Sequence, residues 1–156
     1  MRFCRVLTSL AGGCLAVCLI GAPQAQASVF IHEILADPPG AGGDANRDDV
    51  ISSSADEFIE LYNDADFSVD LSGWTLSDDL RQRHVFGQGT LIGPFGVFVV
   101  FGGGSPVFAD GIFNTASSGG LGLNNTGDIV TLYDAQGLLI DQVIYGSDGG
   151  KDQSLV

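Results

Sequence analysis

The stretch from residue 57 to residue 79, EFIELYNDADFSVDLSGWTLSDD, restricts the fold of this chain more than any other part of the sequence. It begins with polar or aromatic residues that alternate with Ile59 and Leu61, which is the period of a β-strand with one buried face. Short polar residues at 63–66 then favour a turn, because such side chains bond their own backbone. The apolar alternation resumes, and continues at Trp74 after a Ser-Gly corner. The stretch therefore predicts strands joined by tight turns, and an all-β domain.

The rest of the sequence extends this pattern. Helical signals are nearly absent after residue 28, and turn residues recur about every eight to twelve positions, which is typical of a sandwich or barrel. The segment 97–101 is apolar on both faces, so we interpret it either as a central strand covered on both sides or as one edge of an interaction surface. The predicted strands are 29–35, 57–63, 68–71, 74–77, 84–86, 97–101, 122–124, 129–133 and 138–145.

Residues 1–27 have the features of a secretory signal peptide. Two arginines give a basic start, residues 6–20 carry no charge, and Ala25-Gln26-Ala27 is a small-x-small cleavage site. A membrane anchor is the alternative, but it needs about 20 apolar residues, and glycines and a proline interrupt this run. We therefore expect one folded domain over residues 28–156, a secreted, periplasmic or cell-surface location, and no membrane span after cleavage.

Composition excludes several functional classes. The cysteines Cys4, Cys14 and Cys18 all lie in the signal segment, so the mature domain has no disulfide framework and no cysteine-based zinc site or nucleophile. Lipidation at Cys18 is a weaker alternative, because Val17 is bulky for a lipoprotein signal. The mature chain keeps 4 basic and 19 acidic residues, a net charge of −15. So acidic a surface repels phosphate backbones, and we expect no direct nucleic-acid binding.

The best candidate for a functional site is an acidic segment in the long predicted loop from residue 38 to 54. Oxygen-bearing side chains at the alternate positions Asp44, Asn46 and Asp48 are spaced to converge on one hard cation, with the carbonyl of Val50 as a fourth ligand. Calcium prefers such flexible cages of oxygen ligands, whereas magnesium retains more of its water. The segment therefore predicts a Ca²⁺ site.

The second half of this motif departs from the EF-hand loop. An EF-hand would next place glycine at 49 and an acid at 55, and this chain has Asp49 and Ala55. Asp49 can still adopt a left-handed φ at modest cost. We expect Asp56, or alternatively Asp37, to complete the calcium site, and a solvated acidic turn is the alternative interpretation of the whole segment.

Several strings in the sequence resemble one known family. VFIHEI at 29–34 followed by Asp37-Pro38, EFIELYN at 57–63 and VDLSGWTL at 69–76 resemble the lamin tail domain of secreted bacterial proteins. The later segments 92–101 and 125–146 resemble the rest of that domain. The resemblance implies an immunoglobulin-like β-sandwich. It implies no catalytic residues, because the family is known as a binding or structural module that is often appended to secreted or surface enzymes.

Two departures from the family pattern concern the ends of the domain. His32 stands where the family commonly has asparagine, before the first glutamate. The family tends to continue beyond its last strand, whereas this sequence ends at Val156. We therefore expect either a part of a larger protein, truncated at its C-terminus, or a domain that stands alone.

Other polar groups suggest chemistry less specifically. Glu33 and Glu60 are expected to be neighbours across a sheet, where they either act as an acid–base pair or bond backbone amides at a sheet edge, which the resemblance favours. His32 and His84 are too few for a three-histidine zinc site. The basic cluster 81–84 is either an anion-contacting patch or, preferably, a solvated turn that balances neighbouring aspartates.

Two further features are interpreted structurally. Trp74 begins a strand inside an apolar alternation, so we expect it in the core. The glycine-rich segment 102–106 resembles a phosphate-binding loop only in composition, and we interpret it as a flexible connection between strands.

The sequence as a whole predicts a non-catalytic, exported binding or structural module. It would contact protein or polysaccharide at the cell envelope, at or outside the cell surface, through a domain with a calcium-ordered loop. The alternative is an accessory domain of a secreted hydrolase, of nuclease or phosphoesterase type, whose catalytic part is not in this chain. Nothing in the sequence sets an oligomeric state.

Overall fold

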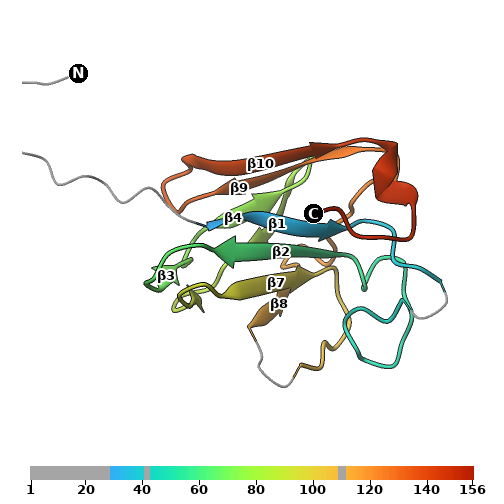
Figure 1. The fold of residues 1–156 in the computed structure, drawn as a ribbon, viewed down its shortest axis with the longest axis horizontal. Coiled ribbons are helices and arrows are strands. Elements are labelled where there is room, and N and C mark those ends of the chain that lie inside the picture. Colours follow the sequence, from blue (N-terminus) through green and yellow to red (C-terminus); the bar gives the residue numbers. More distant parts are fainter. Residues whose placement is uncertain (1–28, 41–42, 109–111) are drawn as a thin grey trace, which may run out of the picture.

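The computed structural model describes residues 29–40, 43–108 and 112–156, so the expected signal peptide and the cysteines lie outside the described residues. The described part folds into a β-sandwich (Figure 1), and the prediction of an all-β immunoglobulin-like fold is confirmed. Its elements are β1 (Val29–Leu35), β2 (Phe58–Asn63), β3 (Val69–Asp70), β4 (Thr75–Ser77), β5 (Gln82–Val85), β6 (Leu91–Ile92), β7 (Val97–Phe101), β8 (Phe113–Thr115), β9 (Asp128–Tyr133), β10 (Leu139–Tyr145) and the 3₁₀ helix η1 (Ser147–Gly150).

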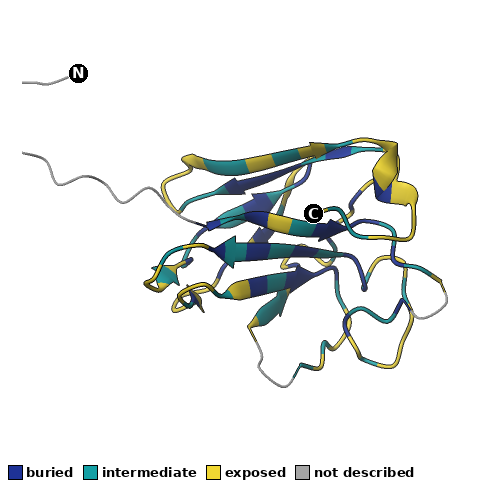
Figure 2. Ribbon diagram, viewed as in Figure 1, coloured by how far each residue is buried: buried dark blue, intermediate teal, exposed yellow. Residues whose placement is uncertain are grey.

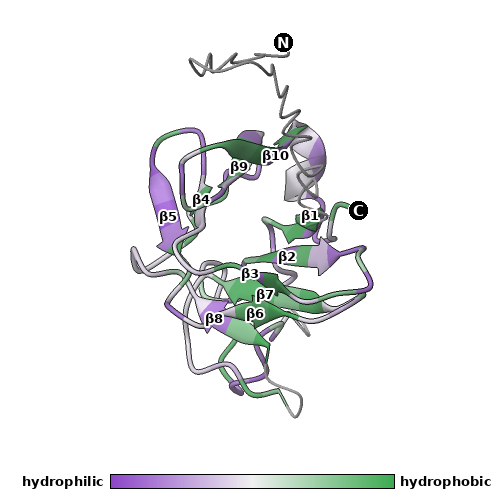
Figure 3. Ribbon diagram, turned by 90° about the vertical axis from the view of Figure 1, so that its left-hand side faces the viewer, coloured by the Kyte–Doolittle hydropathy of each residue, from purple (hydrophilic) through white to green (hydrophobic). Residues whose placement is uncertain are grey.

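The strands form two layers. One sheet has the order β1-β2-β7-β8 and the other the order β10-β9-β4-β5, while β3 and β6 form a separate two-stranded ribbon. All pairs are antiparallel except β7 and β8, which run parallel. Figure 3 shows the two layers edge-on. In the described part of the chain, no helix has the length and apolarity of a membrane-spanning segment.

The core lies between the sheets and follows the alternation seen in the sequence. In β2, Ile59 and Leu61 are buried, while the residues between them are only partly covered. Leu76 and Leu132 of the facing sheet are fully buried, as is Val100 of β7, the strand beside β2. Figure 2 shows buried positions on strands of both layers. Burial of aliphatic side chains from both sheets removes apolar surface from water and holds the layers together. Trp74 is 7% exposed and belongs to this core, which confirms its predicted role.

Asn63 explains the polar break after β2. Its side-chain amide donates to the carbonyl oxygens of Phe67 and Gly93, both at 2.8 Å, and its side-chain oxygen accepts from the amide of Ala65 at 3.1 Å. The residue is fully buried. Because a buried amide must be satisfied internally, one asparagine fixes both the turn after β2 and the approach of the β6–β7 connection.

Asp141 joins the edges of the two sheets. It follows a register shift in β10, and its Oδ2 accepts a 2.8 Å hydrogen bond from the amide of Ile31 in the edge strand β1. Its other oxygen accepts from the amide of Gln142 at 2.8 Å. A charged side chain on an exposed strand edge also discourages pairing with other chains. Further along β1, Ile34 and Leu155 exchange backbone hydrogen bonds at 2.8 and 3.0 Å.

The predicted strands need two corrections, and the structure supports the central-strand interpretation of residues 97–101. Residues 122–124 form no strand, because the amides at 122 and 123 bond the Glu57 carboxylate and that of Asn124 bonds Asp128. The short strands β6 and β8 were not predicted, since two or three residues give no measurable alternation. The segment 97–101 is the interior strand β7, with Phe98 and Val100 buried toward the core.

Candidate functional site

The acidic segment folds around its own carboxylates. Asp44 accepts hydrogen bonds from the amides of Asp48 and Asp49, at 3.1 and 3.0 Å. The side-chain oxygen of Asn46 accepts from the same Asp48 amide at 3.0 Å. The structure thus brings the oxygens of residues 44 and 46 together around one nitrogen. Asp49, at the position that holds glycine in an EF-hand, has a left-handed φ of 65°, and Arg47 is also left-handed with φ 59°.

Asp56 connects two parts of the acidic loop through its side chain. Its two oxygens accept from the amides of Asn46 and Ser52, at 3.1 and 2.7 Å. Asp56 and Asn46 are both fully buried. Each carboxylate oxygen can accept more than one hydrogen bond, so Asp56 retains lone pairs while it ties the two ends of the loop together. Val50 lies at the exposed side of the loop, with 62% of its surface accessible.

The glycine-rich segment after β7 holds this loop in place. The amide of Gly103 donates to the carbonyl of Ala55 at 3.1 Å, and its carbonyl accepts from the Asn46 side chain at 3.2 Å. The amide of Ser105 donates to Asp48 at 2.9 Å. The segment connects β7 and β8, as the sequence indicated, and its hydrogen bonds to the acidic loop were not expected. Its small residues let two backbones approach closely, which periodicity cannot reveal.

Among the described residues, no basic side chain forms an ion pair with the loop carboxylates. The ion pairs found among the described residues join His32 to Glu60, Arg83 to Asp78 and Lys151 to Asp148. The cation nearest in sequence, Arg47, instead lies over the ring of Phe108, 4.9 Å from its centroid. Asp44, Asp48 and Asp56 do not gather within 4.8 Å of one another as a group in the described part of the chain. The calcium ligand set Asp44, Asn46, Asp48, Val50 and Asp56 stays a prediction, and Asp37 accepts from Asn125 at 2.7 Å.

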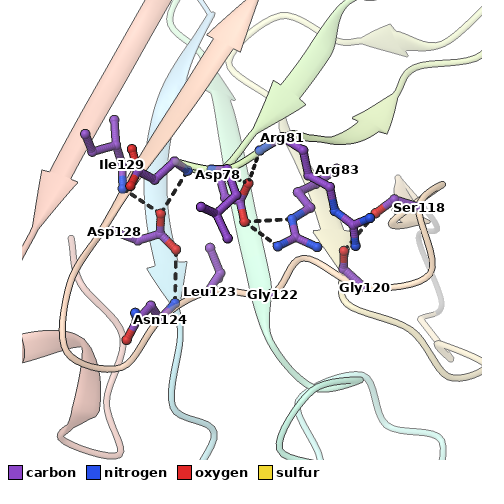
Figure 4. A network of polar contacts seen from close by, with 12 residues as sticks. Asp78, Arg81, Arg83, Ser118, Gly120, Gly122, Leu123, Asn124, Asp128 and Ile129 are labelled. Atoms are coloured by element: carbon purple, nitrogen blue, oxygen red, sulfur yellow. Dashed lines mark hydrogen bonds and ion pairs between the residues drawn. The ribbon is translucent and has the colours of Figure 1, made fainter.

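A buried polar network lies next to this loop, and sequence reasoning missed it. Arg83 donates through Nε to Asp78 at 2.8 Å and also through Nη2, as Figure 4 shows. The side chains of this pair are only 11% and 2% exposed, so the cluster 81–84 is not a solvated turn. It does balance an aspartate, as that interpretation expected. Asp128 accepts from the amides of Asp79 and Asn124, both at 3.0 Å.

Glu57 completes the network from the start of β2. It is 5% exposed, and one of its oxygens accepts from the amides of Gly122 and Leu123, at 3.0 and 3.4 Å. Burial raises the pKa of Glu57 to about 7, although the two amide bonds and Arg83 act in the opposite direction. No signal in the sequence pointed to this role, because Glu57 was predicted to be the first residue of the strand 57–63 and lies just before β2. Its bonds are structural, because they hold the loop before β9.

His84 is a core residue rather than a ligand. It is 3% exposed, its ring meets that of Phe86 edge-on with centroids 4.7 Å apart, and its Nδ1 accepts from the amide of Ser117 at 3.3 Å. Burial lowers the pKa of His84 to about 4. The neutral ring thus packs between β5 and the segment after β8 and is hydrogen-bonded to that segment.

We expect the contribution of His84 to the free energy of unfolding to fall as the pH is lowered from 6.5 toward 4, because the ring takes up its proton at a higher pH in the unfolded chain than in the folded one. The raised pKa of Glu57 contributes with the opposite sign over part of this range, so the His84 contribution is obtained by comparison with a His84 variant. This contribution is fully present above pH 6.5. In an NMR titration, the His84 ring should remain neutral until about pH 4. A His84→Phe chain should lose less stability over the same pH range, and a His84 titration midpoint near 6.5 would contradict the prediction.

Glu33 and Glu60 are direct cross-strand partners, as the sequence predicted. In the part of the chain that the structure describes, no backbone amide donates to Glu60, so the interpretation that this pair bonds amides at a sheet edge is not supported. The Oε1 atom of Glu60 lies 2.8 Å from Nδ1 of His32. The three side chains His32, Glu33 and Glu60 share the outer face of the first sheet and lie away from the core.

The fold consists of two facing sheets whose strands are mostly antiparallel. This arrangement is typical of an immunoglobulin-like sandwich module. The model of the lamin tail domain matches residues 22–147, and the chain belongs to the lamin tail domain family. This confirms the resemblance drawn from its motifs, and the family consists of non-catalytic immunoglobulin-like domains. The match begins inside the segment expected to be a signal peptide. No curated protein matches the chain closely enough to count as a relative.

Proposed function

We propose that this chain is a non-catalytic, exported binding module of the lamin tail family whose acidic loop is ordered by Ca²⁺. The module contacts protein or polysaccharide at or outside the cell surface. Family membership supports the binding role, and the basic start, uncharged run and small-x-small site of residues 1–27 support export. The observation that carries the calcium proposal is the convergence of the Asp44 and Asn46 side-chain oxygens on the Asp48 amide.

The hydrogen bonds of the loop leave room for a cation. Each side-chain oxygen of Asp44, Asn46 and Asp48 has two acceptor sites, and each accepts one backbone amide. The amides fix the direction of the oxygens, and the remaining lone pairs are available to a hard ion. A bound Ca²⁺ would also offset the repulsion between carboxylates for which the described part of the chain provides no basic partner. Its role would be to order the loop, because an ion that binds only the folded chain stabilises it by mass action.

Addition of Ca²⁺ should raise the thermal unfolding midpoint of the purified chain. At a calcium concentration 100 times the dissociation constant, the expected stabilisation is about 2.7 kcal/mol. Calorimetric titration should give one ion per chain, and Mg²⁺ should bind more weakly because it keeps more of its water. Absence of both heat and a thermal shift at millimolar Ca²⁺ would contradict the proposal.

Neutral replacements identify the ligands in this titration. Asp44→Asn and Asp48→Asn should each weaken calcium binding at least about tenfold, since each removes a charged ligand. Asp64→Asn is the control, because Asp64 is an exposed aspartate outside the loop and its loss should leave the affinity unchanged. Equal affinity in all three variants would place the ion elsewhere.

The interaction role has a separate test. The purified chain, with and without Ca²⁺, is incubated with fractions of its own cell envelope, and retained protein and polysaccharide are measured. We expect retention that depends on calcium, and loss of it in Asp48→Asn. Turnover of nucleic acid, phosphoester or glycan by the same preparation would overturn the non-catalytic assignment.

A further inference from the structure

We propose that His32, Glu33 and Glu60 form a second metal site, for a divalent transition-metal ion of the Zn²⁺ type, on the outer face of the β1-β2-β7-β8 sheet. A β-bulge makes this grouping. Successive side chains of a regular strand point to opposite faces, so His32 and Glu33 would normally be separated by the sheet. The β1–β2 register shifts between Ile31 and Glu33. The extra residue places both side chains beside Glu60, with one ligand atom from each within 4.8 Å of the others.

The contacts within the group favour a cation. Glu33 and Glu60 lie directly opposite each other in the register, and like charges in that position destabilise a strand pair. Neither carboxylate forms an ion pair with lysine or arginine among the described residues. The imidazole of His32 is the one partner found, through Nδ1 and Glu60 Oε1 at 2.8 Å. A divalent ion between the three groups would neutralise both carboxylates.

The donor set indicates the class of ion. One imidazole nitrogen and two carboxylate oxygens suit zinc and neighbouring transition metals, whereas calcium takes oxygen ligands alone. Ligands about 2.0–2.1 Å from a tetrahedral zinc lie about 3.3 Å apart, so the His32–Glu60 separation needs to open by only about half an ångström. Metal binding at Nδ1 requires the imidazole proton to be on Nε2.

The site is open on one side. The His32 side chain is 41% exposed and that of Glu60 is 18% exposed. His32 and Glu33 also border a cleft of about 350 Å³, whose other walls include Ile144 and Tyr145 of β10 and Leu155. Three protein ligands leave a fourth zinc position for water or for an incoming ligand. The strands hold the ligands more firmly than a loop would.

The test is a Zn²⁺ titration of the purified chain in excess Ca²⁺, followed by calorimetry and by imidazole ¹⁵N resonances. We expect one zinc per chain and a change of tautomer at His32. His84 should be unaffected, and it is an internal control because the chain has only two histidines. Zinc binding that leaves the His32 resonances unchanged, or no binding at millimolar Zn²⁺, would overturn the proposal.

Matched variants separate this site from others. His32→Gln and Glu60→Gln should each weaken zinc binding at least about tenfold, while Asp66→Asn, which removes an exposed charge elsewhere, should not. An unchanged His84 spectrum shows that each variant is folded. Equal zinc affinity in all variants would overturn the proposal. Asp48→Asn should leave zinc binding unchanged, so the zinc proposal is tested independently of the calcium proposal.

Discussion

Replacement of Asp78 by alanine is expected to destabilise the sandwich by about 3–5 kcal/mol, since it breaks a buried ion pair by removing one partner. Arg83 would keep its charge while its side chain is only 11% exposed. The amides of Leu80 and Arg81, which donate to Asp78 at 3.0 and 2.7 Å, would also lose their acceptor. The free energy of unfolding in urea measures the effect.

The neighbouring residue provides the control. Asp79 is exposed and uses its backbone amide, not its carboxylate, to bond Asp128. Asp79→Ala should therefore change stability by no more than about 0.5 kcal/mol. A small effect at both positions would mean that water reaches the Arg83 guanidinium and that the pair is not buried in solution.

Local periodicity accounts for the parts of the fold that the sequence predicted. Ile59 and Leu61 mark β2 because burial of one sheet face repeats every second residue. The sequence around Trp74 is specific for this fold. Within a few positions it combines a tight turn, a core residue and the start of a strand. These signals depend only on neighbours in the chain, so they can be read without the fold.

Long-range contacts account for the errors. Leu121 and Leu123 are buried in a loop, so their alternation imitates a strand while Glu57 takes the amides of that segment. The bulge at His32 changes which side chains share a face, and period 2 cannot reveal it. In the candidate calcium loop, the side-chain oxygens of Asp44 and Asn46 meet at the amide of Asp48, while the predicted ligand set stays a prediction. The sequence did not reveal that Asp56 would be buried, with its carboxylate accepting hydrogen bonds from the amides of Asn46 and Ser52.

Gly102 shows how the fold supports that loop, and Gly102→Ala should destabilise the chain by about 3 kcal/mol. The amide of Gly102 donates to the carbonyl of Glu57 at 2.8 Å. A Cβ at this position would overlap the carbonyl oxygen of Ser54 and lie 3.0 Å from its carbonyl carbon. Both neighbours are backbone atoms that cannot rotate away, so the loop must shift, at a cost near the upper end of the usual 1–3 kcal/mol for overpacking.

The same shift should lower calcium affinity, because it separates the loop from the segment that holds Asn46 and Asp48. Gly87→Ala is the control, since a Cβ there meets no atom within 4 Å and stability should change by less than about 1 kcal/mol. Urea unfolding and calcium titration of both variants give the two readouts. A Gly102→Ala chain as stable as the parent, with unchanged calcium binding, would show that the loop is not braced by the end of β7. If Gly102→Ala lowers stability but leaves calcium affinity unchanged, Gly102 acts only in packing. Calcium binding would then not depend on the contact between residue 102 and the loop.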